Sequence, residues 1–139
     1  MFKKILVAND GSDGAAKALS AAITLAKHSK CGLHMIAVEE LPRFPASIEE
    51  VVEEQHTAKH QFTKVAQHAR ALAKANHVAV EVHLLAGHPV PTIVDFVGRE
   101  RFDLLVVGYM GHSALYNKLI GSTTDRLVEL APCTVLVVK

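Results

Sequence analysis

Residues 5–12 read ILVANDGS, and this stretch decides the fold. Its first four residues are apolar and are typical of a short buried strand. The polar residues that follow favour a turn, and Ser12 is a good N-cap for a helix. Apolar side chains then recur at helical spacing as far as Gly32. A strand, a tight turn and a helix in this order form the first half of a βαβ unit.

The same alternation continues to the end of the chain. Helical spacing is found again after the capping-box pair Ser47 and Glu50, and over residues 89–100 and 122–132. Alternating strands and helices predict an α/β fold, with a parallel sheet covered on both faces and right-handed crossovers. We expect one domain over residues 1–139, with five strands in the order 3-2-1-4-5. The other four strands are predicted at residues 33–38, 78–85, 104–107 and 134–138.

The third and fifth strands are expected at the edges of this sheet. Residues 78–85 alternate between apolar and polar side chains, which suits a half-covered edge strand. Residues 134–138 are apolar on both faces apart from Thr134, and an exposed apolar edge invites pairing with another chain. We therefore expect a two-fold homodimer joined through the C-terminal strand, with cover by the chain's own loops as the alternative.

Length and composition exclude several classes of protein. The chain has 139 residues, 50% of them hydrophobic and 21% charged, which is typical of a folded domain and not of a disordered one. Lys and Arg number 15 against 14 Asp and Glu, so the basic excess of a nucleic-acid-binding protein is missing. No stretch approaches a signal peptide or the roughly 18 apolar residues of a membrane span. We expect a cytoplasmic protein with no membrane association, in which Cys31 and Cys133 are free thiols.

Two loops leave neighbouring strands at the switch in strand order, where open α/β sheets bind ligands. One spans residues 8–12, and the other runs from Gly108 to the Gly-Ser-Thr-Thr segment at 121–124. Glycine lets backbone N–H groups approach an anion, and the helix that starts at Ser122 favours phosphate at its N-terminus. Asp10 would repel phosphate and suits a ribose hydroxyl or a base amino group. The loops are expected to hold opposite ends of one nucleotide.

Other phosphate-binding motifs fail at particular residues. A P-loop requires a lysine directly before Ser122, and the chain has none there. A dinucleotide fingerprint requires GxGxxG after the first strand, where only Gly11 and Gly14 occur. A response regulator would need an acidic cluster and a phosphoacceptor aspartate, and the sequence lacks both at the required places.

Histidines offer a weaker hypothesis. His56 and His60 have the i,i+4 spacing of a helical zinc-ligand pair, but no third ligand has an evident spacing. Other histidines, such as His34 and His83, are interpreted as surface residues or hydrogen-bonded core residues. The sequence therefore predicts no metal site.

These motifs resemble the ATP-binding branch of the universal stress protein family. Its motif G-x2-G-x9-G-[ST] is complete here, residues 5–12 are similar to the family's first strand and turn, and residues 131–138 to its last strand. The resemblance covers essentially the whole chain. It implies a Rossmann-like, adenine nucleotide α-hydrolase-like fold and a mostly dimeric cytoplasmic protein that binds ATP, with the presence of Mg²⁺ left open.

The resemblance also implies which residues hold the nucleotide. Asp10 would contact the ribose, and His112 is either a phosphate contact or a solvated loop histidine. Asn9 stands where the family usually has an apolar residue. The adenine would lie beside the backbones of Ala8, Asn9 and Val38, and the ribose and phosphates beside Gly108, Gly111, Gly121, Ser122 and Thr123.

The leading functional interpretation is an ATP-binding regulatory or stress-response module. Phosphoryl transfer requires a positioned nucleophile and charge-stabilising groups, and the sequence shows no convincing set, so slow hydrolysis is the most we expect. Two alternatives stay open. One is an enzyme that cleaves ATP to AMP and pyrophosphate, and the other is a dimeric interaction protein of the same family that binds no nucleotide.

Overall fold

The structure is a computed structural model that describes residues 2–40, 48–110 and 120–139, with side chains given outside 48–58. Its centre is a five-stranded sheet in the order β3-β2-β1-β4-β5, in which every neighbouring pair is parallel. The predicted strand order is therefore confirmed. The strands are β1 (Ile5–Ala8), β2 (Leu33–Glu40), β3 (Val80–Gly87), β4 (Leu104–Gly108) and β5 (Thr134–Val138).

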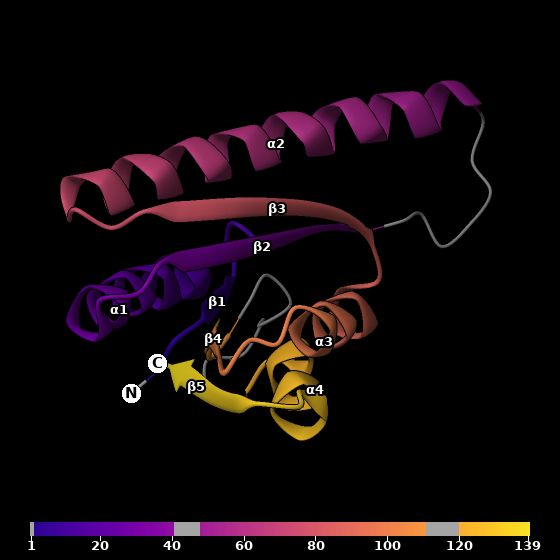
Figure 1. Ribbon diagram of the computed structural model, residues 1–139. Helices are drawn as coiled ribbons and strands as arrows, with labels where there is room; N and C mark the ends of the chain where they lie inside the picture. The colour runs from indigo at the N-terminus through magenta and orange to yellow at the C-terminus, as the bar shows by residue number, and fades with distance from the viewer. Residues whose placement is uncertain (1, 41–47, 111–119) are drawn as a thin grey trace.

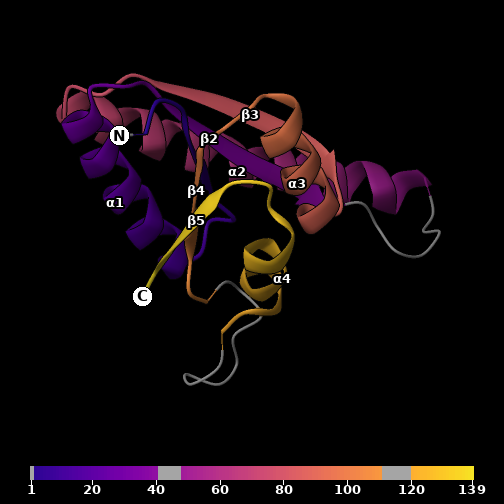
Figure 2. The ribbon, with the colours of Figure 1, turned by 60° about the horizontal axis from the view of Figure 1, so that its bottom comes forward.

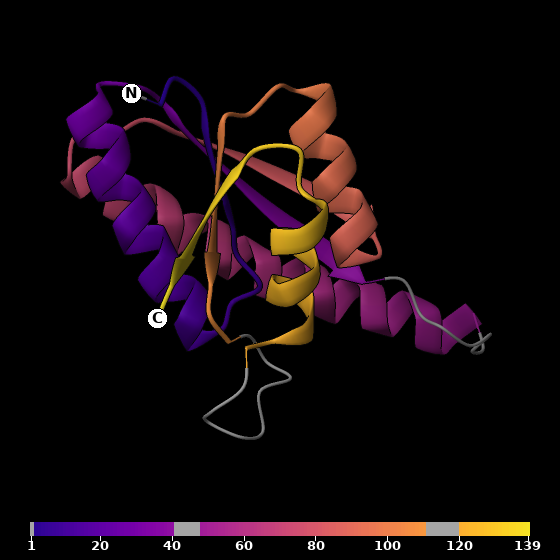
Figure 3. The same cartoon turned by 90° about the horizontal axis from the view of Figure 1, so that it is seen from below.

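Helices cover both faces of the sheet, as Figures 1 and 3 show. One face carries α1 (Asp13–Ser29) and α2 (Ile48–Ala75), and the other carries α3 (Pro89–Arg99) and α4 (Ser122–Leu130). Figure 2 shows α1 on the opposite side of the strands from α3 and α4. Within the described residues, no helix is both long enough and apolar enough to cross a membrane.

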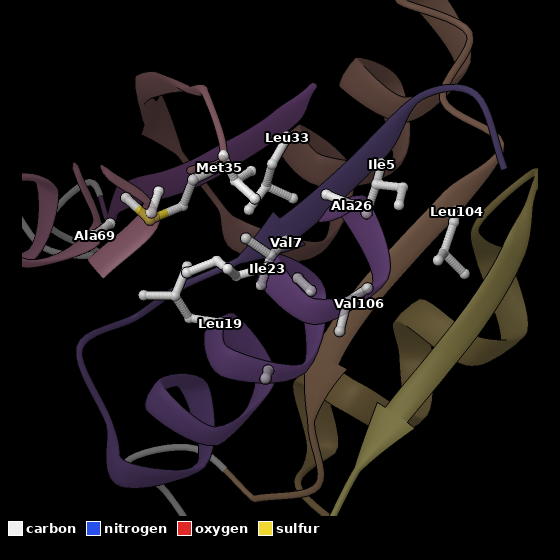
Figure 4. Close-up of a cluster of buried hydrophobic side chains, with 14 residues drawn as sticks. Ile5, Val7, Leu19, Ile23, Ala26, Leu33, Met35, Ala69, Leu104 and Val106 are labelled. Atoms are coloured by element: carbon white, nitrogen blue, oxygen red, sulfur yellow. The ribbon is translucent and has the colours of Figure 1, made fainter. Parts of the chain in front are cut away.

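Strand β1 lies at the middle of the sheet, and its side chains belong to two separate hydrophobic clusters, one on each face. Ile5 and Val7 pack under α1 and α2, whereas Leu6 packs under α3 and α4. All three side chains are fully buried. Figure 4 shows the first cluster, where Ile5 and Val7 meet side chains of α1 and β2. The alternation follows from the period of two in a strand, and it explains why this run has no polar residue.

Helix α1 begins as the sequence predicts and ends earlier. Ser12 is its N-cap, with the side-chain oxygen accepting a hydrogen bond from the Ala15 N–H at 3.2 Å. The helix was expected to reach Gly32, but it ends at Ser29, and Lys30 takes the left-handed conformation at φ 53°. The Lys30 N–H closes the last turn on the helix carbonyls. Lysine at this position does what glycine usually does at the end of a helix.

Strand β3 begins two residues later than predicted. Val78 is buried, but its N–H donates to the carbonyl of Ala73 at 2.9 Å, so this residue closes the turn that follows α2. The alternating apolar pattern of β3 extends back to Val78, so the sequence places the start of the strand two residues too early. The predicted helices over 89–100 and 122–132 are present as α3 and α4, each slightly shorter. The capping box at Ser47 and Glu50 lies outside the described residues and side chains.

Candidate functional site

The two predicted loops meet at one edge of the sheet. β1 and β4 are neighbours and run parallel, with Val7 opposite Val106, so their carboxyl ends reach the same edge. The chain continues from β1 into the start of α1 and from β4 toward the start of α4. This edge lies at the switch point in strand order, where open α/β sheets bind ligands.

Asn9 builds the first loop and is buried, with 6% of its surface exposed. Its backbone N–H donates to the Ile36 carbonyl at 3.0 Å, which continues the sheet one residue past β1. Its side-chain amide donates to the Met35 sulfur at 3.4 Å, and its side-chain oxygen accepts from the Gly11 N–H at 2.9 Å. An apolar residue at this position would leave that N–H without its acceptor. Asn9 therefore shapes the loop with its side chain, a role that the sequence did not reveal.

Asp10 is exposed at the start of α1. Its carboxylate accepts from the Ser12 N–H at 3.0 Å and from the Ser12 hydroxyl. Gly11 between them has φ 83°, a conformation that glycine adopts without strain. Asp10 is thus held in an Asx-type turn above the helix N-terminus. The Asp10 carboxylate therefore has a structural role in this turn, and that role is compatible with a contact to a ligand.

The loops approach each other so closely that two glycines are required. A Cβ on Gly108 would lie 2.7 Å from the carbonyl carbon and oxygen of Gly14, and a Cβ on Gly14 would overlap the Met110 carbonyl oxygen. These neighbours are backbone atoms, which cannot turn aside as a flexible side chain can. The end of β4 therefore packs directly on the first turn of α1.

Backbone and side-chain hydrogen bonds fix α4 beside the end of β4. The Gly121 N–H donates to the Tyr109 carbonyl at 3.0 Å, and the buried Thr124 hydroxyl donates to the Gly108 carbonyl at 2.6 Å. The Tyr109 N–H donates to the Val138 carbonyl at 2.8 Å, which ties the same turn to β5. The two parts of the glycine motif are thereby held together although 12 residues separate them in the sequence.

The first turn of α4 is arranged to receive an anion. Gly121 is the N-cap and has no side chain with which to cap the helix. The side chains of Ser122 and Thr123 are exposed. A helix N-terminus of this kind presents unpaired N–H groups and the positive end of the helix dipole. Asp125 lies in the same turn and opposes an anion to some extent.

The remaining predicted residues are distributed as follows. Ala8 ends β1 opposite Ile36, and Val38 follows two residues later on β2, so both lie at the carboxyl edge. The structure brings both near the loop of Asn9 and Asp10. Gly111 and His112 fall outside the described residues. The side chain of His56 is also undescribed, which leaves the hypothesis of a His56–His60 zinc pair untested.

Two site residues were missed by sequence reasoning. Gly14 was considered only as part of a failed dinucleotide motif, yet its missing side chain permits the contact with Met110. Thr124 was not among the predicted binding residues, yet its hydroxyl positions α4. The Thr-Thr pair after Gly121 was the available signal, because a small hydroxyl residue at the third helical position can bond back to a loop carbonyl.

Both cysteines are free, as predicted, and both are partly buried. Burial raises the pKa of the Cys133 thiol. A backbone hydrogen bond at Leu105 partly offsets this rise, and the Asp103 carboxylate adds a smaller one. Burial likewise raises the pKa of Cys31. Neither thiol is therefore activated as a nucleophile.

The chain is similar in sequence and in structure to known proteins of one family. The sequence model of the Universal stress protein family matches residues 1–139. The universal stress protein YxiE of Bacillus subtilis is 32% identical over 148 residues, which cover 100% of both chains. The structure of the universal stress protein UspA from Lactobacillus plantarum has 26% sequence identity and a TM-score of 0.88, covering 99% of this chain and 98% of that one.

A further solved structure carries a ligand. It is a universal stress protein in complex with cAMP, 25% identical, with a TM-score of 0.77, and the match covers 99% of this chain and 97% of that one.

Proposed function

The chain belongs to the universal stress protein family, and on that premise we propose that it binds an adenine nucleotide, ATP foremost, at the carboxyl edge of β1 and β4. The whole chain, residues 1–139, acts as one nucleotide-binding domain. The cAMP complex of a related protein supports an adenine ligand for this fold. A cytoplasmic location, where adenine nucleotides are plentiful, is part of the same proposal.

One observation carries the proposal: the N-terminus of α4 is held against the end of β4 by Thr124 and Gly121. A phosphate chain would lie over this turn, where the N–H groups of Ser122 and Thr123 point outward from the helix start. The hydrogen bonds to Gly108 and Tyr109 keep the turn in place before the ligand arrives, so binding does not have to order it.

The opposite end of the nucleotide would lie by β1 and β2. Asp10 is held at the rim of the site, where its carboxylate suits a ribose hydroxyl. The adenine would lie beside the backbones of Ala8, Asn9 and Val38. The phosphates would lie beside the backbones of Gly108, Gly111 and Gly121 and the hydroxyls of Ser122 and Thr123. His112, which follows Gly111 in the motif, is proposed as a further phosphate contact.

The protein would act as a dimeric binding module, with slow hydrolysis at most. β5 is an edge strand that pairs only with β4 within the described chain, and Leu136 on it is 37% exposed. Pairing of β5 with its copy in a second chain would satisfy the open edge and cover this apolar surface. The described residues around α4 include a serine and two threonines but no lysine or arginine at the helix start, which favours binding over phosphoryl transfer.

The proposal is tested by native mass spectrometry of the freshly purified protein, followed by calorimetric titration with ATP, with and without Mg²⁺. The discriminating variant is Ser122→Asp. A carboxylate in the first turn of a helix is neutral or favourable for folding, but it repels phosphate. We expect normal unfolding behaviour and a loss of ATP affinity of about tenfold or more. Ser20→Asp, an exposed serine within α1, is the matched control and should bind ATP normally.

The outcomes separate the hypotheses. A dimer with one adenine nucleotide per chain, and weakened binding only in Ser122→Asp, supports the proposal. Unchanged ATP affinity in Ser122→Asp refutes the assignment of phosphates to α4. A dimer that stays empty in millimolar ATP favours the nucleotide-free interaction protein, and release of AMP with pyrophosphate favours the enzyme.

A further inference from the structure

Three metal-ligating side chains come together on β2 and β3, away from the nucleotide edge. His34 lies near the start of β2, directly opposite Glu81 of β3, and His83 follows two residues after Glu81 on the same face. The Nδ1 atom of His34 lies 2.9 Å from Nε2 of His83 and 3.5 Å from a carboxylate oxygen of Glu81. One ligand atom from each residue lies within 4.8 Å of the other two.

We propose that His34, Glu81 and His83 bind a divalent transition-metal ion of the Zn²⁺ class. Two imidazoles and one carboxylate form a common nitrogen and oxygen ligand set for such ions. Tetrahedral Zn²⁺ with bonds of about 2.0–2.1 Å separates its ligand atoms by about 3.3 Å. The two distances from His34 Nδ1, 2.9 and 3.5 Å, bracket that value. The third separation, between the ligand atoms of Glu81 and His83, is at most 4.8 Å, and the exposed Glu81 side chain can move to close it.

Buried aromatic rings hold the two imidazoles in position. His34 packs against the edge of Phe102 with ring centroids 5.0 Å apart, and His83 packs against Phe96 at 4.8 Å. Both phenylalanines are buried and touch each other. The imidazole rings are themselves parallel, with centroids 5.2 Å apart. Ligands fixed by packing lose little freedom when the ion binds, which favours affinity.

The charges around the cluster fit a cation. Burial lowers the pKa of His34 and the Glu81 carboxylate opposes this, so the net shift is toward the neutral form of the ring. Glu81 supplies a negative charge, and its side chain is 68% exposed, which leaves room for water as a fourth ligand. The Lys4 ammonium is the opposing charge. It is bound to the Glu100 carbonyl at 2.6 Å and lies over the Phe102 ring, so it does not fill the site.

The alternative is a metal-free pair of histidines joined by one hydrogen bond. In that arrangement one imidazole donates and the other accepts, and Glu81 stays an exposed ion-pair partner. Such a pair explains the 2.9 Å contact. It does not require the carboxylate, whereas the metal site does. Glu81 is therefore the residue that separates the two interpretations.

The test uses the full chain purified without a histidine tag and stripped with a chelator. Zn²⁺ is titrated against a competing chromophoric chelator, and Co²⁺ is titrated in parallel to record its visible d–d bands. The variants are Glu81→Gln and His83→Gln. His28→Gln is the matched control, because His28 is an exposed histidine at the end of α1.

We expect one Zn²⁺ per chain with a micromolar or tighter dissociation constant. The Co²⁺ spectrum should show intense tetrahedral bands without the sulfur-to-cobalt charge transfer of a cysteine ligand. Glu81→Gln and His83→Gln should each weaken binding by at least about tenfold, and His28→Gln should change nothing. Ring NMR signals of His34 and His83 should be the first to move in wild-type protein.

Two results would overturn the proposal: no binding to the wild type at micromolar Zn²⁺, or equal binding by wild type and Glu81→Gln. Because Glu81 is exposed and glutamine has the same shape, this variant should fold even if His83→Gln does not. The proposal is independent of nucleotide binding, since the cluster lies toward the amino ends of β2 and β3 and the nucleotide edge lies at their carboxyl ends.

Discussion

Replacing Gly14 with alanine tests the close packing on which the site depends. A Cβ there would overlap the Met110 carbonyl oxygen, so the segment after β4 or the first turn of α1 has to move. Gly14 is the second residue of α1, and even in a helix interior alanine stabilises by only about 0.5–1 kcal/mol relative to glycine. Overpacking against backbone costs about 1–3 kcal/mol. The second effect should win, with a net loss of about 1–2 kcal/mol in the free energy of unfolding.

Gly98→Ala is the matched control. Gly98 lies in α3, and a Cβ there would lie 3.6 Å from Cγ of Pro132, which is an ordinary contact. Only the helix propensity then changes, and because Gly98 is the last-but-one residue of α3 we expect a gain of up to about 0.5 kcal/mol. The two variants therefore make the same substitution and should shift stability in opposite directions.

Urea unfolding, followed by circular dichroism, measures both variants. For a chain of this size, each kcal/mol also shifts the melting temperature by about 3–4 °C. If Gly14→Ala were as stable as Gly98→Ala, the contact between Gly14 and Met110 would be refuted. ATP titration adds a second readout, because Gly14→Ala displaces the two loops and should weaken binding while Gly98→Ala should not. A destabilised Gly14→Ala protein with normal ATP affinity would separate the packing from the nucleotide site.

Two further predictions concern a hydrogen bond and a thiol. Thr124→Val removes the hydroxyl that donates to the Gly108 carbonyl, so it should lower the free energy of unfolding in urea by about 1–3 kcal/mol and weaken ATP binding. Thr124→Ser keeps a hydroxyl and should keep both stability and binding. Thr123 is exposed, so Thr123→Val should leave stability unchanged. Burial raises the pKa of Cys133, so its thiolate fraction at pH 8 is smaller than in the unfolded chain. Its alkylation rate should therefore be slower in the folded protein and still rise with pH above 9. Equal rates in folded and unfolded protein would contradict this.

The arrangement of the sheet could be predicted because it depends on local patterns. Each strand is a short apolar run, each helix has its own spacing, and the βα alternation restricts the order of strands. The start of β3 was predicted too early, because the turn before it contains Val78, which fits the alternating pattern of the strand. The burial of β1 on both faces followed directly from its lack of polar residues.

The candidate site was only partly predictable, because its packing depends on contacts between distant residues. Asn9 contacts Met35, Gly14 contacts Met110, and Thr124 contacts the carbonyl that precedes Tyr109. No local rule links such pairs. The motif spacing could identify Gly108 and Ser122 as candidates, but it could not show that a missing side chain at Gly14 permits the loops to meet.

The histidine cluster could not be predicted from the sequence for the same reason. His34 and His83 are 49 residues apart, and His34 has no second ligand at i,i+2 on its own strand. Glu81 and His83 do have that spacing on β3, but two side chains alone do not indicate a metal site. The i,i+4 rule therefore directed attention to His56 and His60 on a helix. What brings His34 to Glu81 and His83 is the register of β2 against β3, because partners opposite each other in a sheet share a face. A register one residue different would send Glu81 and His83 to the face under α2 and abolish the cluster.

The two proposed sites use different properties of the same sheet. At the carboxyl edge, glycines and helix starts expose backbone N–H groups, which suit the dispersed negative charge of phosphates. Toward the amino edge, adjacent strands hold imidazole and carboxylate side chains in register, which suits a compact cation. β2 contributes to both, with His34 toward one end and Val38 toward the other, four residues or about 13 Å apart along the strand. Because neither set of ligands includes a residue of the other, loss of one site by mutation leaves the groups that form the other intact.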